Sequence, residues 1–357
     1  MTKEDILANF DPSQPGLADS VLFGLPFTID QSEFVVVPVP WEVTVSYGSG
    51  ASDGPEAIIA ASSQVDLLHE MYPELWKLGI HNIQSPAHWS VQSEQFKIQA
   101  QQIIKALESG VDIDNDQHLT SQREAINAAC LQFNSEVKEL VAHWISKGKK
   151  VVLLGGDHST PLGYYHALAD RYASFGIIHF DAHMDLRESY EGFHFSHASV
   201  MNNALKLPQL SQLVQVGIRD FCDQESYLAL TDSRVKVYTD RKLKSKLFEG
   251  ITWKQQCDQI ISDLPKYVHV SFDIDALYQW YCPNTGTPVP GGLSYEQATY
   301  LLDQLGKSGK EIIGMDLVEV SPGKNEWDGN VGARMLFHMC GVWAANAGLP
   351  VGNPLRF

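Results

Sequence analysis

Three short stretches of this chain combine histidine and aspartate at spacings that suit metal binding. They are residues 155–159 (GGDHS), 181–185 (DAHMD) and 271–275 (SFDID). In an extended segment alternate side chains point to the same side. The donors within DAHMD would therefore lie on one side of that segment, and those within DID on one side of theirs. Carboxylate oxygens and imidazole nitrogens form a hard, mixed donor set. That set suits Mn²⁺ better than ions that prefer thiolate, although zinc, cobalt or nickel could compete on affinity.

Two metal ions fit this donor set better than one. Four carboxylates around a single divalent ion would leave surplus negative charge, whereas carboxylates can bridge two ions roughly 3.5–4 Å apart. Such a pair holds a water molecule and lowers its pKa toward neutrality. We therefore predict a two-metal centre whose candidate ligands are His158, Asp181, His183, Asp185, Asp273 and Asp275.

Each of the three stretches follows an apolar run that is typical of a buried parallel strand. The runs are Val151–Leu154, Phe175–Phe180 and Tyr267–Phe272. Because the carboxyl ends of parallel strands meet at one crevice, the six candidate ligands should converge there. His179 and His269, inside the runs, are expected to donate hydrogen bonds behind the ligands.

The rest of the chain alternates strand and helix patterns. Further strands are predicted at Glu33–Val39 and near residues 213, 235 and 312. Helices are predicted at Ala57–Leu68, Ser93–Leu107, Arg123–Ile145, Pro161–Tyr172, Trp253–Leu264 and Tyr295–Leu305. This alternation predicts an α/β fold with three layers, αβα, and a mainly parallel sheet. We expect an N-terminal arm at residues 1–30 and a single catalytic domain at 31–357, without internal repeats.

Composition narrows the range of partners. A formal net charge of −17 argues against nucleic acid and anionic membranes and would favour a cationic substrate. The five cysteines are scattered without a CxxC motif, which indicates a reducing, cytoplasmic setting. The N-terminus is polar and acidic, unlike a signal peptide, and no run of about 18 apolar residues predicts a membrane span.

The order of these motifs resembles that of the ureohydrolases, which include arginase, agmatinase and formimidoylglutamase. The resemblance runs from about Val35 to the C-terminus and includes residues 286–292 (GTPVPGG) and 314–322 (GMDLVEVSP). It implies an arginase-like fold and two divalent ions, Mn²⁺ first and Ni²⁺ or Co²⁺ as alternatives. It also implies hydrolysis of a guanidino C–N bond by water activated between the metals, with release of an amine and urea.

The resemblance also implies individual roles. His158 and Asp185 would bind the first metal, His183 and Asp275 the second, and Asp181 and Asp273 would bridge both. Glu319 would pair with the guanidinium in bidentate fashion. His197, in the segment Phe195–Ser199, would carry a proton to the leaving amine or to bulk water, and His194 is the alternative. The catalytic set implied is thus His197, Asp185 and Glu319.

Two loops depart from the family pattern. The aspartate-proline that usually follows the DxD motif is replaced by residues 278–281 (YQWY). The loop after Asp185 lacks the residues with which arginases bind the α-amino acid part of their substrate. Arginine is therefore a poor candidate substrate. Trp280 and Tyr190 are predicted to bind substrate at an aromatic rim around the opening of the active site. The other residues expected in this rim are Trp41, Phe193, Phe195, Tyr281 and Trp327. Such a rim would either hold a cationic tail by cation–π contacts or shorten the pocket.

We expect an agmatinase-like enzyme that converts agmatine to putrescine and urea. Guanidine hydrolase and guanidino-acid hydrolase are alternatives, the latter with Arg187 or Lys324 as the carboxylate partner, followed by formimidoylglutamase. Two other classes are a silent family member that acts in assembly and a metal-dependent deacetylase. The resemblance further implies a homo-oligomer, a trimer or hexamer, with a small guanidino compound as its ligand.

Overall fold

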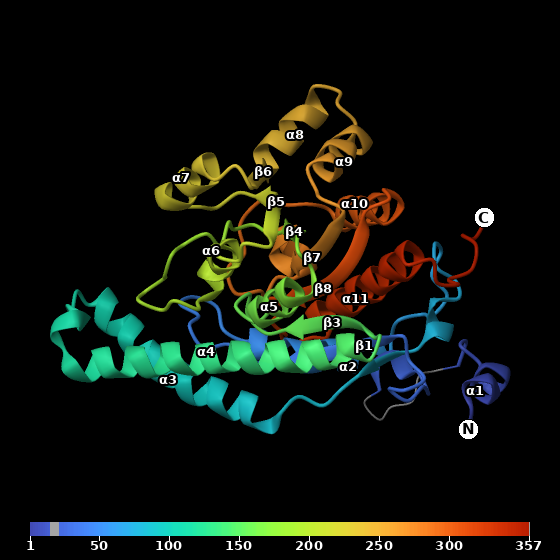
Figure 1. The fold of residues 1–357 in the computed structure, drawn as a ribbon, viewed down its shortest axis with the longest axis horizontal. Coiled ribbons are helices and arrows are strands. Elements are labelled where there is room, and N and C mark those ends of the chain that lie inside the picture. The colour runs from blue at the N-terminus through green and yellow to red at the C-terminus, as the bar shows by residue number, and fades with distance from the viewer. Residues whose placement is uncertain (15–20, 357) are drawn as a thin grey trace.

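Eight parallel strands form one sheet at the centre of the molecule (Figure 1). The computed structural model describes residues 1–14 and 21–356, so residues 15–20 of the predicted N-terminal arm lie outside the described residues. The strand order is β2-β1-β3-β8-β7-β4-β5-β6. The strands are β1 (Phe34–Val39), β2 (Ile80–Asn82), β3 (Lys150–Gly155), β4 (Phe175–Phe180), β5 (Leu210–Ile218), β6 (Val235–Thr239), β7 (Tyr267–Asp273) and β8 (Glu311–Val318).

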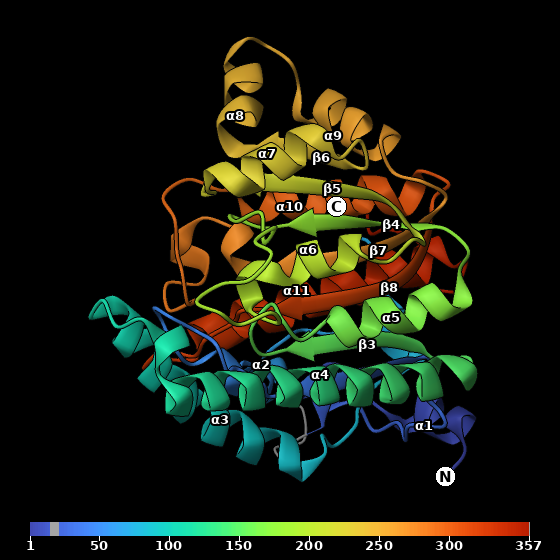
Figure 2. The same ribbon diagram turned by 60° about the vertical axis from the view of Figure 1, so that its left-hand side comes forward.

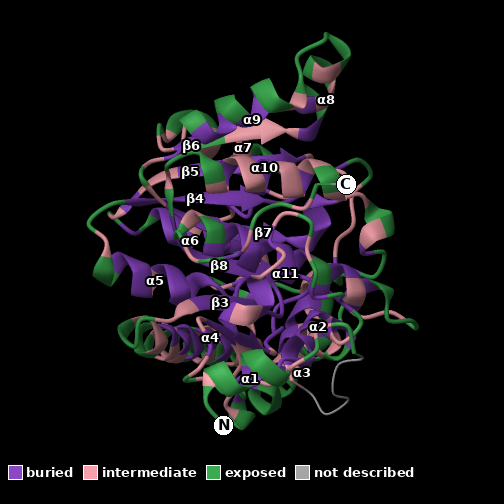
Figure 3. Cartoon of the chain, turned by 90° about the vertical axis from the view of Figure 1, so that its right-hand side faces the viewer, coloured by how far each residue is buried: buried purple, intermediate pink, exposed green. Residues whose placement is uncertain are grey.

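The sheet is buried on both faces, as its apolar runs predict. Side chains alternate along β1: Val36 packs into one core, whereas Val35 and Val37 pack into the other. Figure 3 shows the inner strands as buried and the outlying helices as exposed. The three-layer α/β architecture and the parallel sheet are therefore confirmed.

Helices cover each face of the sheet (Figures 1 and 2). The first layer contains α1 (Lys3–Asn9), α2 (Gly54–Ser62), α8 (Asp240–Phe248), α9 (Trp253–Ser262), α10 (Tyr295–Lys307) and α11 (Trp327–Asn346). The second layer contains α3 (Ala87–Glu108), α4 (Gln117–Ser146), α5 (Leu162–Arg171), α6 (Val200–Leu205) and α7 (Asp223–Thr231).

Several helical segments differ from the sequence-based prediction. The helix α2 ends at Ser62 rather than Leu68, because the Ser62 hydroxyl donates back to the Ile59 carbonyl and accepts the Phe23 N–H. The helix α11 was not predicted. Its residues from Val331 to Ala344 are buried with the single exception of Arg334, so it lacks the polar face that gives a surface helix its period. The short strand β2 and the helices α6, α7 and α8 were also not predicted.

The structure bears on two further expectations. Within the described residues no helix is long and apolar enough to cross a membrane. The five cysteines are all free thiols.

The closest helix packing in the second layer gives a stability prediction. A Cβ atom on Gly163 of α5 would lie 2.4 Å from the Asn134 carbonyl oxygen and 2.8 Å from Cβ of Val137, both on α4. Gly163→Ala should therefore lower the free energy of unfolding by about 1–3 kcal/mol, the usual cost of overpacking. At a helical position with free space, replacing glycine by alanine would raise the free energy of unfolding instead. The sign of the change therefore shows whether α4 packs closely against Gly163. Urea denaturation measures it, and unchanged or higher stability would contradict close α4–α5 packing.

Candidate metal centre

Five neighbouring strands end at the same edge of the sheet, and each presents polar side chains there. In sheet order β3 is followed by His158, β8 by Glu319, β7 ends in Asp273, β4 is followed by Asp181, and β5 is followed by Arg219 and Asp220. Parallel strands bring their carboxyl ends together, which explains why residues far apart in the sequence meet. The structure thus brings all six predicted metal ligands to one place.

Asp181 lies between two groups of potential ligands. Its Oδ2 atom lies 3.0 Å from Nδ1 of His158, which is also 3.3 Å from Oδ2 of Asp185. Its Oδ1 atom lies 3.3 Å from Nδ1 of His183, which is 3.1 Å from Oδ2 of Asp275. We call these groups the His158 subsite and the His183 subsite. One carboxylate therefore offers one oxygen to each subsite, the arrangement that a bridging ligand requires.

Backbone amides hold the carboxylates in these orientations. The Ala182 N–H donates to Oδ1 of Asp275 at 2.9 Å, and the Asp275 N–H donates to Oδ1 of Asp273 at 2.8 Å. The other oxygen of Asp275 faces His183, and that of Asp273 lies 3.1 Å from Nδ1 of His158. Each carboxylate thus has one oxygen fixed by the backbone and one directed at a histidine.

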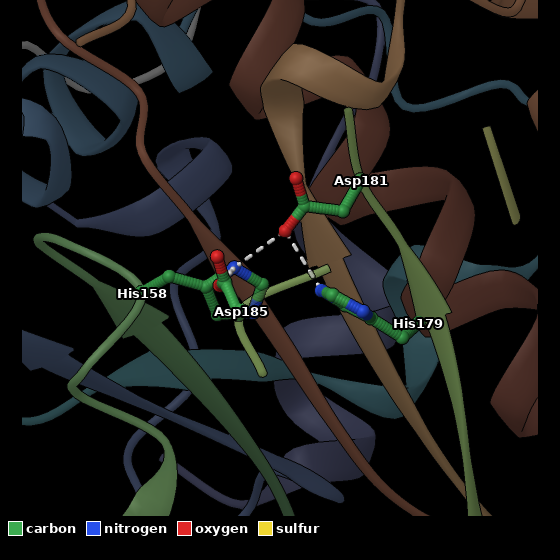
Figure 4. A group of neighbouring side chains, drawn as sticks. All are labelled: His158, His179, Asp181 and Asp185. Atoms are coloured by element: carbon green, nitrogen blue, oxygen red, sulfur yellow. Dashed lines mark hydrogen bonds and ion pairs between the residues drawn. The ribbon is translucent and has the colours of Figure 1, made fainter. Parts of the chain in front are cut away.

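His179, on β4, fixes the orientation of Asp181. Gln215 donates from Nε2 to Nδ1 of His179 at 3.0 Å, so the proton of the neutral His179 ring lies on Nε2. That nitrogen lies 2.7 Å from Oδ2 of Asp181 and donates to it (Figure 4). His179 thus contacts Asp181, one of the predicted ligands, whereas His269 pairs with Asp316 instead.

The chemistry of the cluster fits divalent cations. Burial and the neighbouring carboxylate of Asp181 raise the pKa of Asp185 well above its ordinary value, and burial with Asp275 does the same for Asp273. Buried carboxylates at this density are stable in ionised form only when positive charge lies among them. Burial opposes the cationic form of His183, yet Asp275 and Asp181 outweigh it and raise the pKa of His183 to about 12. Oxygen and imidazole donors around concentrated negative charge are what Mn²⁺ and similar ions prefer.

Two functional residues adopt backbone conformations that disfavour side chains. Asp185 has φ of 54° and Glu319 has φ of 63°, both in the left-handed region. A residue other than glycine held there costs about 1–3 kcal/mol, and such strain gathers at functional sites. The cost at Asp185 is offset locally, because its carbonyl accepts the N–H groups of Met201 and Asn202.

A close approach of two loops positions the segment that carries His158. The Gly156 N–H donates to the Val39 carbonyl at 2.8 Å, and the Asp157 N–H donates to the Trp41 carbonyl at 3.0 Å. A Cβ atom on Gly156 would lie 2.1 Å from the Trp41 carbonyl oxygen, so only glycine fits. Trp41 is itself buried and stacks on Phe133 at 4.1 Å between ring centroids, so it does not reach the rim.

Glu319 is placed beside the His158 subsite and faces a cavity. Its Oε1 atom accepts the His158 N–H at 2.8 Å, and its own N–H donates to the Gly156 carbonyl at 2.9 Å. Burial and the nearby Asp273 raise the pKa of Glu319 well above its ordinary value. Among the described residues it forms no ion pair, and a cationic ligand in the cavity would stabilise its ionised form.

A cavity of about 370 Å³ opens beside the predicted metal ligands. His158, His183, Asp185, Asp273 and Glu319 line its floor, and the predicted site residues His197 and Tyr190 line its wall. Burial, together with the neighbouring His183 and His158, lowers the pKa of His197 to about 4, so the ring is neutral near pH 7. His194 is exposed and lies outside the cavity lining.

Trp280 does not line this cavity, contrary to its predicted contact with substrate. Its side chain is 63% exposed and stacks on Tyr278 at 4.4 Å between ring centroids. Its carbonyl accepts the indole N–H of Trp327, which turns the segment outward. The other aromatic residues expected at the rim, namely Trp41, Phe193, Phe195, Tyr281 and Trp327, are likewise outside the lining.

Sequence reasoning missed several residues of the cavity wall. Asp220, Phe221 and Glu225 line it together with Arg187, which lies over the Tyr190 ring at 4.7 Å from its centroid. Because Asp220 follows the end of β5, the rule that located the metal ligands could have found it. The strand near residue 213 was predicted, but the residues after it were not considered.

Comparisons with known proteins agree with this geometry. The model of the arginase family matches residues 32–341. The N(1)-aminopropylagmatine ureohydrolase of Thermus thermophilus is 31% identical over 320 residues, 89% of this chain and 93% of that protein. The agmatinase of Neisseria meningitidis is 29% identical over 300 residues, 83% of this chain and 82% of that protein.

A solved structure of low sequence identity shows the same fold. The agmatine ureohydrolase of Thermoplasma volcanium matches with a TM-score of 0.66 and 21% identity, over 97% of this chain and 99% of that chain. The family match, the relatives and the fold therefore support the same family assignment. The chain belongs to the arginase family and is a ureohydrolase, a hydrolase of amidino C–N bonds.

Proposed function

We propose that this protein hydrolyses agmatine to putrescine and urea. The observation that carries the proposal is the position of Glu319, which forms no ion pair among the described residues and lines the same cavity as His158, His183, Asp185 and Asp273. A guanidinium ion placed against Glu319 would donate a planar, charge-assisted pair of hydrogen bonds from its N–H groups to the carboxylate oxygens. That pairing holds the guanidinium carbon above the two subsites.

The proposed ligand assignment follows the resemblance. His158 and Asp185 would hold one divalent ion, His183 and Asp275 would hold the other, and Asp181 and Asp273 would be shared between them. When bound, the ions would supply a water molecule of lowered pKa as the nucleophile. Mn²⁺ is the proposed metal because the donor set is hard, with Ni²⁺ and Co²⁺ as the competing ions.

His197 is the proposed proton carrier. Addition of water to the guanidinium carbon and cleavage of the bond to the alkyl nitrogen give urea and a free amine, which must gain a proton. A neutral His197 accepts a proton released by the attacking water and donates it to that nitrogen. The ring lies in the cavity wall beside Tyr190, with 6.3 Å between the two ring centroids.

The cavity wall suits a cationic tail better than an anionic one. Asp220 is exposed at the wall, and among the described residues it forms no ion pair. Arg187, the only arginine or lysine in the lining, has Nε 3.8 Å from Oε2 of Glu225 and rests on the Tyr190 ring. Its charge is already partly balanced, so a guanidino acid gains less from it. Lys324, the other cation suggested for a carboxylate tail, lies outside the lining.

A longer substrate of the same class is the second candidate. The Thermus relative is named for N(1)-aminopropylagmatine, in which a further aminopropyl group extends agmatine. Tyr47, 84% exposed, and Phe221, 43% exposed, stand at the cavity wall and offer aromatic faces to a second amine.

A cytoplasmic setting and assembly into a trimer or hexamer are also part of the proposal. The free cysteines support the cytoplasmic setting.

The bridging role of Asp181 predicts that its loss weakens the binding of both ions. The Asp181→Asn variant should bind fewer than two Mn²⁺ per chain. Its activity should fall by more than the roughly 10–100-fold that is typical when a hydrogen-bond partner behind a metal ligand is lost. Metal analysis after dialysis and urea release measure the two effects. Two tightly bound ions and full activity in this variant would show that Asp181 does not bridge.

The two histidines of the loop can be separated by matched variants. His197→Asn should lower kcat about 10²–10⁴-fold, the usual contribution of a general acid–base group, with KM changed far less. His194→Asn is the control and should match the unaltered enzyme, because its side chain is exposed outside the cavity. A large loss with His194→Asn and none with His197→Asn would reverse the assignment.

Substrate preference tests the cationic-tail proposal. Hydrolysis, read as urea release, should be most efficient with agmatine or N(1)-aminopropylagmatine and poor with guanidine, guanidinobutyrate, guanidinopropionate and arginine. Formimidoylglutamate, whose hydrolysis would be read as formamide release, should also be a poor substrate. Asp220→Asn should lower kcat/KM for the cationic compounds about two- to fivefold, as for an exposed ion pair, and leave guanidinobutyrate unaffected or improved. Asp223→Asn, three residues further on and outside the lining, is the matched control. Preference for a guanidino acid would overturn the proposal.

A further inference from the structure

A chain of buried polar side chains lies directly behind the His158 subsite. Nε2 of His158, on the side of the ring away from the carboxylates, is 2.9 Å from Oγ of Ser271. Ser271 also lies 2.9 Å from the hydroxyl of Tyr165 and 2.9 Å from Oδ1 of Asp316. Asp316 in turn lies 2.6 Å from Nε2 of His269. His158 is 1% exposed, and Ser271, Asp316, Tyr165 and His269 are 0% exposed.

The sheet register places these groups together. Ser271 of β7 is paired with His179 of β4 on one side and with Asp316 of β8 on the other. His269, Ser271 and Asp273 alternate along β7 and so share one face of the sheet. The helix α5 covers that face and supplies Tyr165, whose ring meets His269 edge-on at 5.1 Å between centroids.

Counting donors and acceptors gives this chain a direction. Ser271 has a single hydroxyl proton, and the carboxylate of Asp316 is the strongest acceptor within its reach, so Ser271 donates to Asp316. The Ser271 oxygen is then left to accept, from the Tyr165 hydroxyl and from N–H at Nε2 of His158. Nδ1 of His158 consequently carries the free lone pair and faces Asp181, Asp185 and Asp273.

The His183 subsite has no such support. Nδ1 of His183 faces Asp275 and Asp181, but within the described residues no side chain or backbone group bonds to its Nε2. Its side chain is 23% exposed, against 1% for that of His158. The two histidine ligands therefore differ in how firmly the protein sets their tautomer and ring orientation.

We propose that Ser271, Asp316 and Tyr165 are positioning residues for His158, which they hold in the tautomer and orientation that bind a divalent cation. The proposal rests on the proposed function only in taking His158 as a metal ligand. None of the three touches substrate or metal, and they act through the imidazole ring alone. Outer partners of this kind typically contribute 10–100-fold to metal affinity.

Neighbouring tyrosines allow a matched test. Tyr165→Phe removes the hydroxyl that donates to Ser271, whereas Tyr164→Phe removes an equally buried hydroxyl of α5 that donates to the Val151 carbonyl instead. Ser271→Ala removes the acceptor for His158 itself. Titration of each chelated protein with Mn²⁺ alone, read as ions bound per chain, gives the affinities of the two subsites.

We expect Ser271→Ala to weaken binding of one of the two ions about 10–100-fold and to leave the other nearly unchanged. Tyr165→Phe should shift the same ion in the same direction by a smaller factor, and Tyr164→Phe should match the unaltered protein. Wild-type affinity for both ions in Ser271→Ala, or equal losses in the two tyrosine variants, would overturn the proposal. Should Ser271→Ala fail to fold, the two tyrosine variants decide alone.

Failure of the proposed function is distinguishable from failure of this inference. If no guanidino compound releases urea but the Mn²⁺ titrations differ as expected, the positioning role stands and the substrate assignment falls. If agmatine is hydrolysed while all variants bind Mn²⁺ alike, the positioning role falls alone.

Discussion

The structure depends on the burial of several carboxylates at one edge of a parallel sheet. Like charges out of contact with water repel strongly, and burial together with the neighbouring carboxylates raises the pKa values of Asp185, Asp273 and Glu319. Cations among the carboxylates relieve that repulsion, so the same feature that is unfavourable for folding creates affinity for divalent metals. The strained backbones of Asp185 and Glu319 and the burial of His158 are tolerated because the surrounding structure holds the site in place.

The sheet and the loops contribute different parts of the function. Strand ends fix the metal ligands, and backbone amides hold one oxygen of Asp273 and of Asp275 so that the other faces a histidine. The loops after β4 and β5 supply His197 and Asp220 to the cavity wall. This division explains how one family can keep its chemistry and change its substrate, since altering the loops leaves the strand ends in place.

The metal half of the site was predictable from the sequence, and the rim was not. His158, Asp181 and Asp275 follow buried apolar runs, and local spacing together with parallel topology places them. Trp280 was expected at the rim because it follows the DxD motif, yet the Trp327 indole holds its backbone and the ring turns outward, which no local pattern reveals. The helix α11 escaped prediction for a related reason, since a helix buried on nearly all sides has no periodic polar face.

The central claim is that two metal ions share the carboxylate of Asp181. Electron paramagnetic resonance of the Mn²⁺-loaded protein, recorded with the metal content of the same sample, tests it most directly. Two Mn²⁺ per chain with the spectrum of a spin-coupled pair is the predicted result, because bridged ions lie roughly 3.5–4 Å apart. One Mn²⁺ per chain, or two with the spectrum of isolated ions, would contradict the account.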